Sequence, residues 1–217
     1  MGTVDILLWG LLSEKKKDRL RAAELLGQLG DPKAVRPLLG IVHNSYEDID
    51  VRIAATRSVA KIGDLNAVPE LLDAYGVCTK KLEKPILLAI GQILGRTFPD
   101  DDNSREIYSD ALNTLIHLVQ RDASNLPLRA QDDARDRAEA AAEALGRTGD
   151  PKAIPVLTTA LERYPDEDVR NAARESLQRF ILTHPDAILR NTPEERHRLG
   201  RQIQDAQRDE LSQQICK

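Results

Sequence analysis

The residues of this chain that are best suited to bind a metal ion are its four histidines and two cysteines. A metal site built on helices needs ligands three or four positions apart, because such residues share one helix face. The histidines are too far apart for this; they are His43, His117, His184 and His197. Cys78 and Cys216 form neither a zinc-binding spacing nor a disulfide framework. The sequence therefore predicts no metal site.

Cys78 is a second candidate for chemistry, because its neighbours could activate it as a nucleophile. Lysines follow at positions 80, 81 and 84, and nearby cations lower the pKa of a thiol. The competing interpretation, which we favour, is an inert cysteine at a helix end. Carboxylate pairs such as Asp132 and Asp133 fall in expected loops, where acidic side chains are solvated. We accordingly expect no catalytic residue and no cofactor.

The stretch from Gly27 to Lys33 resembles a phosphate-binding loop, since two glycines precede a lysine. It lacks the Gly-Lys-Ser/Thr ending that holds a phosphate, and it recurs along the chain. Gly30 returns as Gly63, a separation of about 33 residues that is typical of helical repeats. It returns again as Gly149, followed as before by aspartate and proline. We interpret these glycines as left-handed residues that end one helix in each repeat.

Each repeat is expected to contain two helices, A and B, joined at the Gly-Asp turn. In the first A helix, apolar residues recur at helical spacing, and small alanines let neighbouring helices approach closely. The predicted fold is all-α, a solenoid of about five helical hairpins with a capping helix at each end. One domain, 1–217, comprises a capping helix at 3–13, repeats at 14–43, 48–76, 82–121, 131–163 and 166–190, and a C-terminal helix at 192–217. Residues 122–136 are interpreted as an inserted loop.

The repeated pattern is Arg-x-x-Ala-Ala-x-x-Leu-Gly-x-x-Gly-Asp-Pro-x-Ala-Val/Ile. It is present at Arg19–Leu38, Arg52–Leu71 and Ala138–Leu157. This pattern resembles the HEAT-like repeats of the phycobilisome-lyase type, over most of residues 14–182. The resemblance implies a right-handed superhelix whose B helices line the concave side and whose A helices line the convex side.

The resemblance also implies ion pairs between the arginine of one repeat and the turn aspartate of the repeat before it. The candidate pairs are Asp31 with Arg52 and Asp150 with Arg170. The pattern lacks its arginine at Leu87 and Ala138, so this ladder is expected to be interrupted in the middle of the chain.

Proteins with such repeats include bilin lyase subunits, phycobilisome-degradation factors, an iron hydroxylase, DNA-base glycosylases and many scaffolds. The iron hydroxylases need histidine-glutamate pairs, and no histidine of this chain precedes a glutamate. The glycosylases need a basic concave face, whereas the predicted B helices carry mixed charge. We therefore expect a scaffold or adaptor that binds a protein partner and is not an enzyme. The open alternative is a bilin lyase or another phycobilisome-related pigment-handling subunit.

The surface predicted to bind the partner is the concave face of the B helices. Helical position alone selects its candidate residues, which are Arg36, His43, Glu70, Asp73, Asn113, His117 and Glu162.

The bulk composition limits the class of partner and the compartment. Hydrophobic residues make up 41% of the chain, enough for a core, and aromatic residues only 3%, which indicates closely packed helices. A net charge of −4 favours neither a nucleic acid nor a membrane. The apolar run from Ile6 to Leu12 is too short to span a bilayer, and no basic residue precedes it as in a secretory signal. We expect a cytoplasmic protein, with its oligomeric state open.

Overall fold

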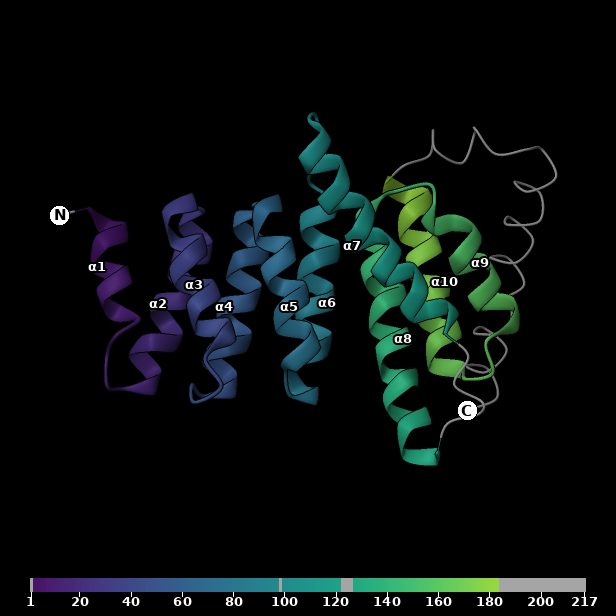
Figure 1. The fold of residues 1–217 in the computed structure, drawn as a ribbon, viewed down its shortest axis with the longest axis horizontal. Coiled ribbons are helices and arrows are strands. Elements are labelled where there is room, and N and C mark those ends of the chain that lie inside the picture. The colour runs from purple at the N-terminus through teal and green to yellow at the C-terminus, as the bar shows by residue number, and fades with distance from the viewer. Residues whose placement is uncertain (1, 98, 122–126, 184–217) are drawn as a thin grey trace, which may run out of the picture.

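A computed structural model describes residues 2–97, 99–121 and 127–183 of the chain. These residues form ten α-helices that pack as consecutive pairs in two layers (Figure 1). The A layer contains α2 (Lys16–Leu29), α4 (Ile49–Ile62), α6 (Lys80–Leu94), α8 (Leu128–Thr148) and α10 (Glu167–Thr183). The B layer contains α3 (Val35–His43), α5 (Val68–Val77), α7 (Asp102–Gln120) and α9 (Ala153–Arg163). The prediction of an all-α solenoid is confirmed.

The A helices pack mainly on one another from repeat to repeat, whereas the B helices pack mainly on A helices, so the core runs along the whole stack. In the A layer, α2 packs on α4, α4 on α6, α6 on α8 and α8 on α10. Each B helix packs on the A helix that follows it in the chain. The first helix, α1 (Thr3–Gly10), covers the free side of α2. One apolar core therefore extends from Leu11 to Phe180.

The Gly-Asp turn joins helix A to helix B as predicted in three repeats. Gly30, Gly63 and Gly149 follow their helices with φ of 70°, 81° and 68°, a left-handed conformation that favours glycine. The aspartate that follows each glycine accepts a hydrogen bond from a backbone N–H two residues on, as from Lys33 to Asp31 at 2.9 Å. The third repeat differs, because Gly95 has φ −69° and α7 begins only at Asp102.

A second glycine of the pattern has a packing role. A Cβ atom added to Gly27 would lie 2.6 Å from Cβ and 2.7 Å from Cα of Ser58, on the neighbouring helix α4. Gly146 has the same relation to Ser176 on α10, where the added Cβ would lie 2.7 Å from Cα. Without a side chain, these glycines let two helices approach at distances that no other residue allows.

The inserted loop predicted at 122–136 is wrong over its second half. Helix α8 begins at Leu128, directly after Pro127, and therefore includes Asp132 and Asp133. The sequence there is rich in alanine and arginine, two residues with a high helix propensity, and this outweighs the loop tendency of the aspartates. Asp133 is also held by an ion pair, because its carboxylate lies 2.6 Å from Nζ of Lys80 on α6.

The predicted pairs of Arg52 with Asp31 and of Arg170 with Asp150 are wrong as well. Arg52 is 6% exposed and donates two hydrogen bonds, of 2.9 and 2.7 Å, to the carbonyl oxygen of Val42. Arg170 likewise donates to the carbonyl oxygens of Tyr164 and Pro165. The last carbonyls of a helix lack partners and carry its negative dipole end, so the repeat arginine stabilises the end of the preceding B helix instead.

The part of the fifth repeat after Thr183 and the C-terminal helix predicted at 192–217 lie outside the described residues. Within the described ranges, none of the helices combines the length and apolar character that crossing a membrane requires.

Candidate functional site

The seven residues predicted from helical position all lie exposed on the B layer. Two are on α3, two on α5, two on α7 and one on α9; they are Arg36, His43, Glu70, Asp73, Asn113, His117 and Glu162. Because α3, α5 and α7 pack side by side and α7 also packs on α9, these positions form one continuous surface. We call the exposed surface of α3, α5, α7 and α9 the B-layer face.

The middle of the B-layer face is acidic. Glu70 and Asp73 are exposed on α5, and Glu106 and Asp110 are exposed on the adjacent α7. Residues 106, 110, 113 and 117 are three or four positions apart, so they share one face of α7. Cations are found on the flanking helices, with Arg36 on α3 and Arg163 on α9. This arrangement suits a partner that presents basic groups toward α5 and α7.

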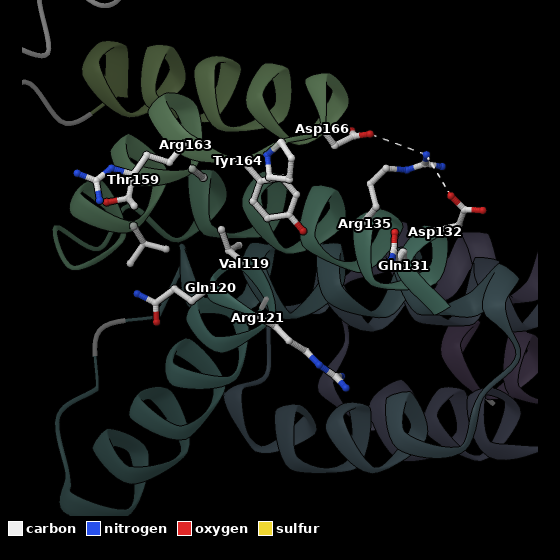
Figure 2. Close-up of a pocket in the computed structure, with 13 residues that line it drawn as sticks. Val119, Gln120, Arg121, Gln131, Asp132, Arg135, Thr159, Arg163, Tyr164 and Asp166 are labelled. Atoms are coloured by element: carbon white, nitrogen blue, oxygen red, sulfur yellow. Dashed lines mark ion pairs between the residues drawn. The ribbon is translucent and has the colours of Figure 1, made fainter. Parts of the chain in front are cut away.

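A hollow of about 540 Å³ adjoins this face where α7 and α9 end and α8 and α10 begin (Figure 2). Helix α7 contributes Gln120 to it, and α9 contributes Thr159 and Arg163. The aromatic ring of Tyr164 lies between these elements, with its hydroxyl turned toward α8 in the view of Figure 2.

An ion-pair network borders one side of the hollow. Arg135 on α8 lies 3.5 Å from the carboxylate of Asp132 and 3.8 Å from that of Asp166, which precedes α10 (Figure 2). Asp166 also accepts a hydrogen bond of 2.9 Å from the N–H of Asp168. The network connects the start of α8 to the start of α10. In contrast, Arg121 and Arg163 form no ion pair with the described residues.

None of the seven predicted residues lines this hollow, although Gln120 and Arg163 belong to the same helices. The sequence did not reveal it because its walls come from the ends of four helices in different repeats. One signal was available: Pro127 followed by strong helix formers indicates that α8 begins early, which brings Asp132 and Arg135 to this place.

The side chains considered for chemistry are in environments that do not activate them. Burial raises the pKa of the Cys78 thiol, with a smaller effect from Glu83, so the nearby lysines do not produce a thiolate. Sγ of Cys78 donates to the carbonyl oxygen of Tyr75 at 3.4 Å. Burial and the carboxylate of Asp150 also raise the pKa of Tyr108. Among the described residues, no three His, Cys, Asp or Glu side chains gather in a way that would hold a metal ion.

Comparison with known families agrees with this architecture. A model of HEAT repeats matches residues 4–90 and, a second time, residues 87–178. The chain belongs to the HEAT repeat family. HEAT repeats are pairs of helices that stack into a solenoid, and proteins built from them commonly bind other proteins along the stack. No curated protein is significantly similar in sequence.

Three solved structures align with this chain over most of its length. The phycocyanin lyase complex of CpcE and CpcF from Nostoc sp. PCC7120 aligns with a TM-score of 0.55 and 20% identity, over 92% of this chain and 75% of that one. Human deoxyhypusine hydroxylase in complex with glycerol aligns at 0.41 and 16%, over 93% and 84%. A designed armadillo repeat protein in complex with the peptide (KR)4 aligns at 0.47 and 15%, over 94% and 99%. At these identities the likeness concerns the fold alone.

Proposed function

We propose that this HEAT repeat protein is a scaffold without enzymatic activity that binds a protein partner through the B-layer face. The observation that supports the proposal is the continuous exposed surface formed by the four B helices, with an acidic centre at Glu70 and Asp73. Stacked helices hold such a surface rigid before the partner arrives, so little conformational entropy is lost on binding. The partner is expected to present lysine or arginine side chains to α5 and α7.

A charge reversal at the acidic centre tests this proposal. The variant Glu70→Lys with Asp73→Lys should abolish retention of the partner that wild-type protein retains from its native lysate. The matched control is Glu24→Lys with Glu175→Lys, which makes the same change in net charge on exposed positions of α2 and α10 in the A layer.

The partner recovered by the wild-type chain is then purified, and its affinity for all three proteins is measured by titration calorimetry. The control should bind as the wild type does, and both variants should melt within a few degrees of it. Equal affinity of the B-layer variant and the control would refute the proposal, because the acidic centre would then contribute nothing.

A second candidate function is the handling of a pigment, such as a bilin, in the hollow of Figure 2. Its volume of about 540 Å³ is in the range of small-molecule sites. Arg121 and Arg163, which form no ion pair with the described residues, could bind carboxylate groups. A phycocyanin lyase has a similar fold, which makes a bilin the natural probe. Titration with a bilin should then shift its visible absorbance band, and Arg163→Ala should weaken the shift. An unchanged spectrum at stoichiometric bilin would exclude this candidate.

A further inference from the structure

Two hollows lie end to end on the A layer, and no B helix contributes to either. The first, of about 520 Å³, lies between α4 and α6; the second, of about 510 Å³, continues it toward α8 and α10. Gln92 and Arg147 line both. We call them together the A-layer groove, whose charged lining residues are Arg57, Lys61, Lys81, Lys84, Arg96, Arg147 and Arg179. No carboxylate of the described chain is among the lining residues.

The boundary between α4 and α6 differs in charge from the boundaries on either side of it. Between α2 and α4, Nζ of Lys16 lies 2.8 Å from Asp48 and 2.7 Å from Asp50. Between α6 and α8, Lys80 lies 3.0 Å from Asp136 and also pairs with Asp133.

Between α4 and α6, both helices present cations. Arg57 and Lys61 on α4 face the groove together with Lys81 on α6. Lys84 also lines the groove, but it is paired with carboxylates of α8. No ion pair of the described residues joins these two helices. Cations on both sides of a boundary repel each other, and an anion placed between them would convert that repulsion into attraction.

Several donors of the groove are free to bind such an anion. The side chains of Arg57, Lys61 and Lys81 form no hydrogen bond or ion pair with the described residues. Nη1 of Arg179 is buried without an acceptor in the described chain, and a buried donor without an acceptor destabilises the fold. Lys84, by contrast, is already paired with Glu139 at 2.8 Å.

The groove is also lined by apolar residues, which we call its floor. Ala60 and Leu88 line it, together with Pro85 in the interior of α6. From Lys81 to Gln92 the helix rises about 16 Å, the length of roughly five extended peptide residues. We propose that the A-layer groove binds an acidic peptide segment of a partner protein, with an apolar side chain on the floor and carboxylates at both rims.

A peptide suits this groove better than a nucleic acid does. A phosphate backbone binds to a basic track that continues beyond any single hollow. Here carboxylates interrupt such a track on the α8 side of the groove, where Glu139 and Glu143 pair with Lys84. The net charge of −4 would also repel a polyanion as long as a duplex.

Fluorescence anisotropy with the full-length chain tests the proposal. The probe is a fluorescein-labelled peptide of eight residues, six glutamates with two leucines at its centre. We expect saturable binding that weakens as salt is raised. The variant Lys61→Ala with Lys81→Ala removes two cations that form no ion pair within the described part of the chain, and it should weaken binding roughly 3- to 30-fold.

The matched control is Lys17→Ala with Arg21→Ala, which removes from α2 two exposed cations that have no ion pair with any described residue. It should bind the probe as the wild type does. Equal losses in the two variants would overturn the proposal, as would no saturation at 1 mM chain (about the weakest affinity worth assigning). An octaglutamate peptide that binds as tightly as the probe would overturn the role of the apolar floor. A DNA duplex that displaces the probe more effectively than unlabelled probe would replace the peptide with a nucleic acid.

Discussion

The close contact between Gly27 on α2 and Ser58 on α4 makes a sharp test of the packing of the A helices. A methyl group at Gly27 would place Cβ 2.6 Å from Cβ of Ser58, whereas two carbon atoms prefer a separation of about 3.5–4.0 Å. Helices α2 and α4 must therefore separate by roughly 1 Å in the variant Gly27→Ala. Rotation of the serine cannot relieve the overlap, because Cα of Ser58 lies only 2.7 Å from the added atom.

The expected change in stability is the difference of two effects. Overpacking a well-packed interface costs about 1–3 kcal/mol, and contact with a backbone atom places this site at the upper end. Replacing glycine by alanine inside a helix stabilises by about 1 kcal/mol. The variant Gly27→Ala should therefore lose roughly 2 kcal/mol of unfolding free energy. The same substitution at Gly40, where an added Cβ meets nothing within 4 Å, should instead gain about 1 kcal/mol.

Urea unfolding followed by circular dichroism measures both variants against the wild type. The two should differ by about 3 kcal/mol, which is a shift of about 1–3 M between their midpoints. Gly76→Ala, equally free of neighbours on α5, serves as a second control. If Gly27→Ala unfolds at the same urea concentration as Gly40→Ala, the glycine of the pattern is not required for close helix packing and the reasoning is wrong.

Three further substitutions test interactions elsewhere. Tyr75→Phe removes a buried hydroxyl that has no partner among the described residues, so the urea midpoint should rise by an amount equivalent to about 1 kcal/mol; a fall would contradict this. Arg52→Met leaves the carbonyl oxygen of Val42 without its two donors and should lower the unfolding free energy by about 2 kcal/mol in the same assay. An unchanged urea midpoint would contradict this, because it would mean that water fully replaces the two hydrogen bonds. The hydrogen bond from Arg19 lowers the pKa of Glu47, so this carboxylate stabilises the fold above its unfolded pKa of about 4.3, and the contribution is lost as pH falls through the lower folded value. Glu47→Gln should therefore be less stable than the wild type at pH 7 and approach it below about pH 4, and a difference that stays constant with pH would contradict the assignment.

The helices and turns of the fold were predictable because the signals for them lie within each repeat. A left-handed glycine, the aspartate after it and the apolar spacing around it are determined within one repeat, and Gly30, Gly63 and Gly149 occupy their predicted places. The start of α8 was missed because acidic residues were interpreted as a loop. Asp133 is instead paired with Lys80 of α6, and such a pair depends on the neighbouring repeat.

The side-chain contacts between repeats could not be predicted from the repeat pattern of the sequence. Arg52 was expected to meet the aspartate of the previous turn, yet the carbonyl end of α3 lies nearer and offers a stronger site for a buried guanidinium. The exposure of the seven B-layer residues was predictable, because exposure on one helix follows from helical position alone. The hollow of Figure 2 was not found, because its walls come from several helix ends.

The A-layer groove also depends on contacts between repeats, so it could not be predicted from the sequence. Lys80, Lys81 and Lys84 are close in sequence, and from the sequence they were considered only as neighbours of Cys78. In the fold, Lys80 and Lys84 turn toward carboxylates of α8, while Lys81 turns toward α4 and meets Lys61 and Arg57 across the groove. One turn of α6 thus contributes both to a boundary with ion pairs and to a boundary without them.

The net charge of the chain does not reveal these surfaces. The acidic residues of the B-layer face and the basic residues of the A-layer groove have opposite charges, which largely offset each other in the sum. A scaffold with faces of opposite charge on one rigid stack could hold two partners of opposite charge at once, each excluded from the other's surface by repulsion.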